Sequence, residues 1–193
     1  AGLSAAGSIL HYLEMTEHRQ TDHLRSISRL DSEDAVWIDK FSIANLELFS
    51  SNGGARRTSF ADVIDRTLTP MGGRLLKRWI AMPLRKVEQI EARHDVVETF
   101  CKEPELHEAV MEQIARVGDL ERIASRVAAA RVLPRELLQL KQSLTAVEML
   151  KALLDSTDHA SLHRLSGAID VMEEVRTQIE QTIYPDPETN QIQ

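Results

Sequence analysis

The sequence predicts a mainly α-helical fold, a multi-helix bundle with at most one short strand or hairpin near residues 24–39. Three observations predict it. Apolar residues recur at three- and four-residue steps along most of the chain, which is the period of an amphipathic helix. Aromatic residues make up only 4% of the 193 residues, which is few for a sheet built on aromatic and β-branched pairs. Proline, glycine and short polar residues interrupt the apolar runs where helices are expected to begin and end.

The first quarter of the chain predicts two helices around a polar stretch. A helix is expected over residues 3–17, followed by a polar stretch over residues 18–34. Valine, tryptophan and isoleucine at residues 36–38 predict one short strand. Ser42 is expected to cap a helix that runs to Phe49 and ends in a serine- and glycine-rich turn.

A structural joint is predicted between a helix over residues 59–68 and a helix over residues 74–82. Proline favours the first turn of a helix, and glycine allows backbone angles that other residues resist. We expect the joint to fix the angle between the two helices. It comprises Thr69, Pro70, Met71, Gly72, Gly73 and Arg74.

The remaining sequence predicts a series of packed helices. One runs over residues 86–102, Pro104 begins the next, Gly118 stops it and Asp119 caps another that starts at residue 120. Two long helices are expected to finish the fold, one from Pro134 and one whose apolar residues run from 162 to 183. Their apolar spacing makes narrow seams for packing at shallow crossing angles.

Composition favours a soluble, cytoplasmic domain that is cut from a longer protein. The formal net charge is −7, whereas a dedicated nucleic-acid-binding domain is usually basic, so this chain alone is expected to bind DNA poorly. Cys101 is the only cysteine and no apolar run is long enough to cross a membrane. The first residues already have a helical pattern without an initiator methionine, which indicates a fragment.

The search for catalytic and metal sites gives weak candidates only. No phosphate-binding glycine loop is present. His159 and His163 are four residues apart and could share a zinc ion, but a third ligand and a glutamate base are missing, so surface histidines are the preferred interpretation. His94 and Cys101 would lie about 10 Å apart along one helix, too far for proton transfer, and Cys101 is expected to be a small packing residue.

Basic residues gather next to Trp79. An arginine and an aromatic ring can grip phosphate and base, and Arg74, Lys77 and Arg78 are the candidates for weak phosphate contacts. A solvated helix face paired with nearby carboxylates is the preferred interpretation, because the domain is acidic. Trp79 is in register with apolar neighbours and is expected in the core. The whole cluster comprises Arg74, Lys77, Arg78, Arg85 and Lys86.

Several strings, in order, resemble one family. Residues 58–84 read TSFADVIDRTLTPMGGRLLKRWIAMPL, residues 42–48 read SIANLEL, and residues 6–13 read AGSILHYL. The strings GDLERI from residue 118 and PREL from residue 134 follow with fitting spacing. Together they resemble the core (lever) domain, domain III, of the MutS family of DNA mismatch-repair proteins, over about residues 5–185.

The resemblance implies that residues 1–193 form one helical domain of a larger protein, without its clamp, mismatch-binding and ATPase domains. Such a domain is a structural, signal-transmitting link between the DNA-binding clamp and the ATPase domain, and no catalytic, cofactor or metal residue transfers to it. ATP and Mg would bind elsewhere in the parent. The implied partners are the other domains of the parent chain, the parent dimer and, through the parent, mismatched duplex DNA, with no membrane.

Two other function classes stay open at this point: a free-standing helical protein-interaction module, and a small helical enzyme that uses the histidines. A domain separated from its parent is also expected to expose an apolar patch and to self-associate at high concentration.

Overall fold

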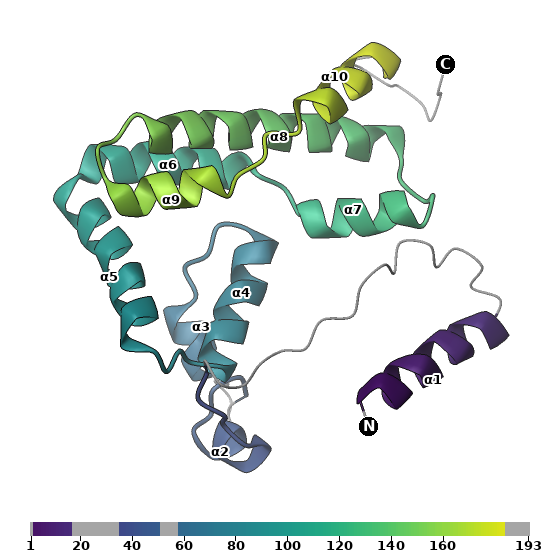
Figure 1. The fold of residues 1–193 in the computed structure, drawn as a ribbon, viewed down its shortest axis with the longest axis vertical. Helices are drawn as coiled ribbons and strands as arrows, with labels where there is room; N and C mark the ends of the chain where they lie inside the picture. Colours follow the sequence, from purple (N-terminus) through teal and green to yellow (C-terminus); the bar gives the residue numbers. More distant parts are fainter. Residues whose placement is uncertain (1, 17–34, 51–57, 184–193) are drawn as a thin grey trace.

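The structure, a computed structural model, describes residues 2–16, 35–50 and 58–183, and ten helices lie in these ranges (Figure 1). The mainly α-helical prediction is confirmed. Within the described ranges the only extended pairing is an isolated antiparallel bridge between Ala35 and Leu84, where the Val36 amide donates to the Pro83 carbonyl at 2.8 Å. The strand expected over residues 36–38 is therefore reduced to this bridge, and the polar stretch over residues 18–34 lies outside the described residues.

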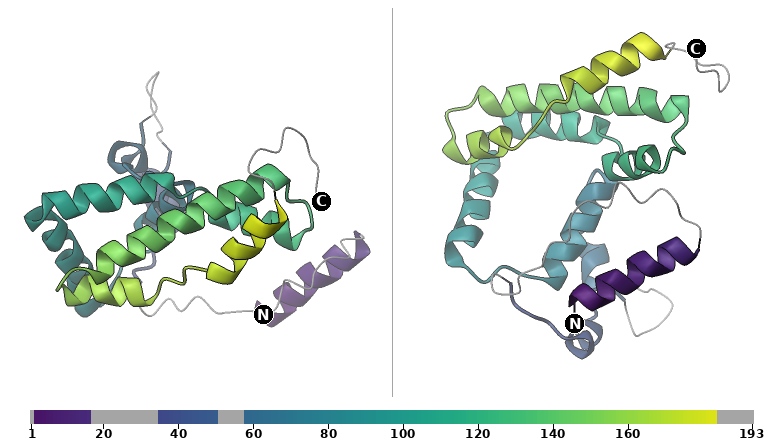
Figure 2. Two further views of the ribbon diagram at one scale, coloured as in Figure 1. Left: turned by 90° about the horizontal axis from the view of Figure 1, so that it is seen from above. Right: turned by 45° about the vertical axis from the view of Figure 1, so that its right-hand side comes forward.

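The longest helix, α8, is the centre of the bundle. It packs against α6, α7, α9 and α10, while α5 packs against α6 and α9 (Figures 1 and 2). Helices α3 and α4 form a smaller unit beside this bundle, and α1 lies apart from the bundle in Figure 1. The helices are α1 (Gly2–Met15), α2 (Lys40–Asn45), α3 (Phe60–Ile64), α4 (Pro70–Ala81), α5 (Val87–Lys102), α6 (Pro104–Arg116), α7 (Leu120–Ala128), α8 (Pro134–Asp155), α9 (Ala160–Gly167) and α10 (Glu173–Thr182).

The hydrophobic core lies where α5, α6, α8 and α9 meet. Val110 of α6, Leu154 of α8 and Leu162 of α9 are buried and contact one another. On each helix, other apolar residues lie three or four positions from these residues, so one apolar stripe of each helix faces the core. The partly buried residues around them are Val96, Phe100, Leu106, Ile114, Leu150, Leu153 and Ile169.

The predicted last helix is wrong in one respect, because it is two helices. Helix α9 ends at Gly167, and α10 begins only at Glu173. Between them Met172 has a φ of 50°, in the left-handed region, and its amide donates to Asp170 Oδ1 at 3.0 Å. An aspartate side chain that accepts a hydrogen bond from the backbone amide two residues later stabilises a turn in place of a helix, and the chain forms that turn here.

The helix predicted to start at Ser42 also differs. Asp39 is the cap, and it accepts hydrogen bonds from the amides of Phe41 and Ser42 at 2.8 and 3.0 Å. Helix α2 ends at Asn45, short of the expected Phe49, and Glu47 then reverses the chain with a φ of 50°. The Glu47 carbonyl accepts the amide of the first residue of α3. The glycine-rich turn expected after residue 50 lies in the undescribed range 51–57.

Candidate functional site

The predicted joint is the start of α4 and the turn before it. Thr69 is the cap of α4 and accepts a hydrogen bond from the Gly72 amide at 3.0 Å, and Pro70 is the first helical residue. Helix α3 stops at Ile64, and not at residue 68 as expected. Residues 65–69 therefore make the turn, in which Asp65 Oδ1 accepts from the Thr67 amide at 2.9 Å and from its hydroxyl at 2.7 Å.

The two glycines of the joint serve close packing. Both Gly72 and Gly73 lie inside α4, and neither has a φ in the left-handed region, so the expectation that they supply unusual backbone angles is wrong. A Cβ atom on Gly72 would lie 3.2 Å from Thr69 Oγ1 and 3.3 Å from Thr67 Cβ. The turn folds tightly against the first turn of α4, and a side chain at residue 72 would require Thr67 or Thr69 to shift.

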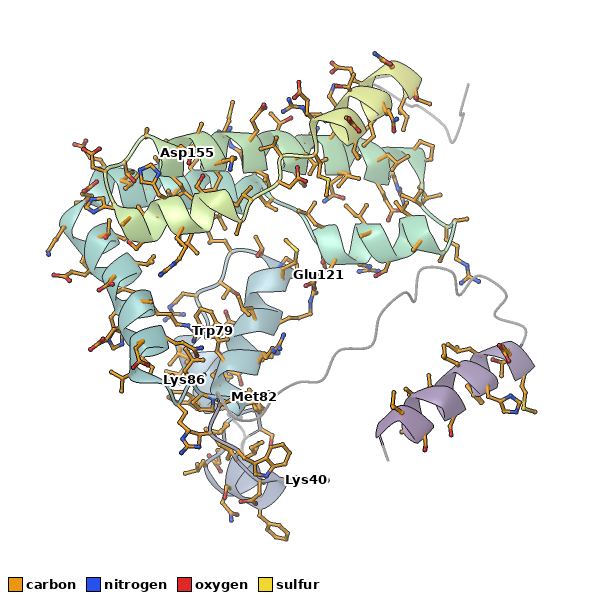
Figure 3. All side chains as sticks on the ribbon, in the orientation of Figure 1. Lys40, Trp79, Met82, Lys86, Glu121 and Asp155 are labelled. Carbon is orange, nitrogen blue, oxygen red and sulfur yellow. The ribbon has the colours of Figure 1, made fainter. Side chains whose placement is uncertain are left out.

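Arg74 joins α4 to the start of α7. Its guanidinium donates to both carboxylate oxygens of Asp119, at 3.0 Å from Nη1 and 2.6 Å from Nη2, and Nε donates to Glu121 Oε2 at 2.8 Å. Figure 3 labels Glu121, which lies near the start of α7. A bidentate arginine–carboxylate pair fixes direction as well as distance. We call Arg74, Asp119 and Glu121 the clasp.

The clasp is anchored in the bundle. Asp119 also caps α7 by accepting the Arg122 amide at 3.2 Å. The Gly118 amide, one residue earlier, donates to Ser143 Oγ of α8 at 2.9 Å, and a Cβ atom on Gly118 would lie only 3.0 Å from Gln139 Nε2. Gly118 therefore follows the end of α6, as expected, but its role is to let the chain approach α8. Two polar contacts thus connect α4 with α8 by way of residues 118 and 119.

The other basic residues near the clasp have different surroundings. Lys77 lies close enough to Asp62 and Asp65 to help lower the pKa of both carboxylates, after the larger effect of their own hydrogen bonds. Arg78 is exposed and has no carboxylate within ion-pair distance in the described part of the chain. Trp79 is 42% exposed, so its expected place in the core is wrong. Its ring is covered by Arg93 of α5, whose guanidinium carbon lies 3.5 Å from the ring centroid.

The histidines and the cysteine are separate features. The His159 imidazole bonds the Glu103 carboxylate, and His163 Nδ1 lies 3.9 Å from Asp155 Oδ1, so the two rings have different partners. No group of three or more histidine, cysteine, aspartate or glutamate residues in the described ranges is placed to hold a metal ion. Cys101 is exposed, which makes its interpretation as a packing residue wrong. No described helix has the length and apolar character needed to cross a membrane.

The clasp should weaken in acid. The hydrogen bonds that Arg74 donates hold the pKa of the Asp119 carboxylate below its usual range. The ionised carboxylate therefore stabilises the fold fully above its unfolded-state pKa of about 4, and this stabilisation is lost as the pH falls through the lower pKa of the folded state. We expect the melting temperature of the wild type to drop faster than that of Asp119→Asn below about pH 4. Thermal unfolding of both proteins between neutral and acidic pH measures this. A difference between the two that stays constant across the range would contradict it.

The fold and the clasp define a helical scaffold domain in which an ion pair ties a small helical unit to a larger bundle. The sequence model of MutS domain III matches residues 42–193. The chain belongs to the MutS domain III family, and the resemblance noted from its motifs is confirmed.

Curated relatives agree with this assignment. The chain is 43% identical over 188 residues to the DNA mismatch repair protein MutS of Bacteroides fragilis (strain YCH46), which covers 96% of this chain and 22% of that protein. It is 44% identical over 188 residues to MutS of Bacteroides thetaiotaomicron, with 96% and 22% covered. It is 40% identical over 185 residues to MutS of Porphyromonas gingivalis, with 95% and 20% covered. The chain thus spans about a fifth of the length of these relatives.

Proposed function

We propose that this domain is the signal-transmitting core of a DNA mismatch-repair protein and links its DNA-binding clamp to its ATPase domain. The observation that carries the proposal is the match to MutS domain III in relatives that are about five times longer than the chain. Residues 1–193 act as one domain, and the clamp, mismatch-binding and ATPase domains belong to the rest of the parent protein. The domain is not itself catalytic.

The geometry supports a mechanical role. Helices satisfy their own backbone hydrogen bonds and move as stiff units, so they can carry a displacement from one end of a domain to the other. Helix α4 is tied to α7 by the clasp and to α5 by the contact of Trp79 with Arg93. Both ties are side-chain contacts at the surface of α4. They can break and reform without loss of the core, as a switch between two arrangements requires.

The parent protein supplies the remaining parts of this function. It works in the cytoplasm as a dimer, binds mismatched duplex DNA, and binds ATP with Mg through a domain outside this chain. Within this chain, Arg74, Lys77 and Arg78 would make at most weak phosphate contacts. Of these, Lys77 and Arg78 are the better candidates, because the Arg74 guanidinium already bonds two carboxylates.

Breaking the clasp should uncouple ATP binding from DNA release in the full-length parent. For Arg74→Met we expect ATP-dependent release from mismatched DNA to slow by roughly 2- to 30-fold, with DNA affinity in the absence of ATP unchanged. Stopped-flow anisotropy of a labelled mismatched duplex measures both quantities. Arg85→Met is the control, because Arg85 is an exposed arginine outside the clasp. Normal ATP-dependent release by Arg74→Met would refute the coupling role.

A further inference from the structure

The backbone of residue 118 is bonded to helix α8 through a buried serine. The Gly118 amide donates to Ser143 Oγ at 2.9 Å, and the Ser143 hydroxyl donates to the Gln139 carbonyl, also at 2.9 Å. Because the single hydroxyl hydrogen is used in the bond to Gln139, the oxygen is left as an acceptor for the Gly118 amide. Ser143 is 1% exposed, so both bonds are shielded from water.

A tight turn connects this buried bond with the clasp. The Leu120 amide donates to the Gly118 carbonyl at 3.0 Å, and Asp119 between them has a φ of −79° and a ψ of 80°. These angles are close to those of an inverse γ-turn, in which three residues close one hydrogen-bonded ring. Gly118 is thus bonded at both its amide and its carbonyl. The direction of the Asp119 side chain therefore depends on where residue 118 lies against α8.

The geometry leaves little freedom on either side of this turn. A Cβ atom on Gly118 would lie 3.0 Å from Gln139 Nε2 and 3.2 Å from Ser143 Oγ, so the backbone lies directly against α8. On the other side, Asp119 accepts two hydrogen bonds from the planar guanidinium of Arg74. Such a bidentate pair depends on direction, so a shift of the turn that misaligned one bond would weaken both.

We propose that Ser143 is a positioning residue of the clasp. Its hydroxyl holds residue 118 against α8, and the turn then directs the Asp119 carboxylate toward Arg74. The clasp and Ser143 act in series, so a change in the position of α4 is passed to α8 only while both contacts are intact. The consequence for the parent protein rests on the proposed signalling function, whereas the positioning itself is a property of the 193-residue chain.

Titration of the Asp119 carboxylate in the 193-residue chain tests the positioning. The hydrogen bonds from Arg74 hold the pKa of this carboxylate below its usual range. Ser143→Ala should raise that pKa toward the value measured in Arg74→Met, because the displaced carboxylate no longer meets both guanidinium nitrogens. Carbon-detected NMR of the side-chain carboxyl gives the pKa in the folded protein. A loss of stability alone does not change this signal, since it reports contacts within the folded state.

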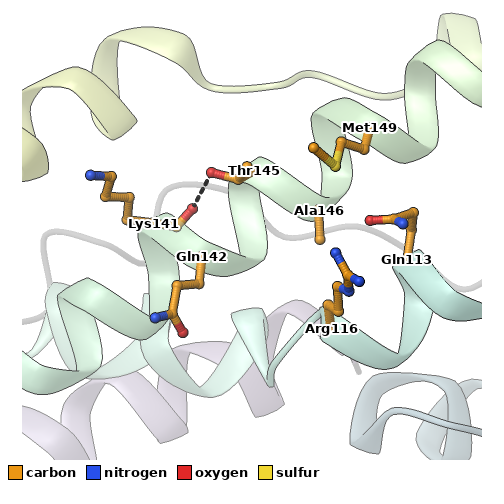
Figure 4. A pocket seen from close by; sticks show the side chains of 7 residues that line it. All are labelled: Gln113, Arg116, Lys141, Gln142, Thr145, Ala146 and Met149. Atoms are coloured by element: carbon orange, nitrogen blue, oxygen red, sulfur yellow. Dashed lines mark hydrogen bonds between the residues drawn. The ribbon is translucent and has the colours of Figure 1, made fainter.

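Thr145→Val is the matched control, because it removes a hydroxyl from the same helix and keeps the shape of the side chain. The Thr145 hydroxyl also donates to a carbonyl four residues earlier, that of Lys141 at 3.1 Å (Figure 4). In the described part of the chain it accepts no hydrogen bond from another segment, so the pKa of Asp119 should stay at its wild-type value. Gly118→Ala is a second test, which keeps the serine but places a Cβ atom 3.2 Å from its hydroxyl, and it should raise the pKa as well. An unchanged pKa in both Ser143→Ala and Gly118→Ala would overturn the proposal, and so would an equal rise in Thr145→Val.

The full-length parent tests the coupling in series. Ser143→Ala should slow ATP-dependent release from mismatched DNA by roughly 2- to 30-fold, in the same range as Arg74→Met. The double variant should be no slower than the slower single variant, because each substitution has already interrupted the same route. Fully additive effects would overturn the serial arrangement. Normal release by Arg74→Met would refute the signalling function instead, and the titration of Asp119 would still decide whether Ser143 positions the clasp.

Discussion

Leu162→Ala is expected to lower the free energy of unfolding of this domain by about 2–5 kcal/mol. Leu162 is 0% exposed and lies in the core beside Val110 and Leu154. Its loss would leave a cavity where three helices meet, and the surrounding side chains are held by helices that relax only in part. Urea unfolding followed by circular dichroism measures the change.

Leu165→Ala is the matched control for this substitution. Leu165 is the same residue type on the same helix, three positions later, but it is 44% exposed. Its replacement should cost less than about 1 kcal/mol. If both substitutions lowered the stability equally, α9 would not be packed through Leu162, and the position of α9 against α6 and α8 would be wrong.

Helix starts could be predicted from the sequence because their chemistry is local. Asp119 caps α7, and Pro104 and Pro134 are first helical residues, as expected; a helix was also expected to open at Ser59, and the structure shows Ser59 as the cap of α3 in a reciprocal pair with Asp62. Each of these features is decided within three or four residues. The miss at α2 is of the same local kind, since both Asp39 and Ser42 can cap a helix and the aspartate lies three residues earlier.

Helix breaks inside an apolar pattern could not be predicted in this way. The apolar period continues from Leu162 through Ile169 to Ile179 without a change of spacing. Ile169 packs against the core although it lies between two helices. An apolar residue in a turn and one in a helix give the same pattern when both are buried, so period alone cannot separate them.

The sequence predicted a break between two helices near Thr69 and Pro70, and α4 begins there, but the contacts of Arg74 were not predicted. The partners of Arg74 lie 45 and 47 residues further along the chain. A pairing over that distance has no periodic signal in one sequence. The GDLERI string was the available signal. It resembles the family as closely as the joint does, and its carboxylates, Asp119 and Glu121, are suitable partners for an arginine.

Gly72→Val is expected to destabilise the domain by about 2 kcal/mol or more, because it both overpacks the joint and disturbs a helix cap. A Cβ atom there lies 3.2 Å from Thr69 Oγ1, the atom that caps α4, and 3.3 Å from Thr67 Cβ in the preceding turn. Valine adds two methyl groups to that contact. The Thr69 hydroxyl would be pushed from the Gly72 amide, or the turn over residues 65–69 would move away from α4.

Gly167→Val separates this effect from the general effect of valine in a helix. Gly167 is also a helical glycine, but a Cβ atom on it meets nothing within 4 Å, so its substitution should change the stability by no more than about 0.5 kcal/mol. Urea unfolding of the two variants gives the comparison.

In the full-length parent, Gly72→Val should also impair ATP-linked DNA release, because Arg74 is two residues away and its direction depends on the same helix start. A Gly72→Val protein with wild-type unfolding and wild-type release would mean that the turn adapts freely. The joint would then not fix the angle between α3 and α4, and only the clasp would hold α4 in place.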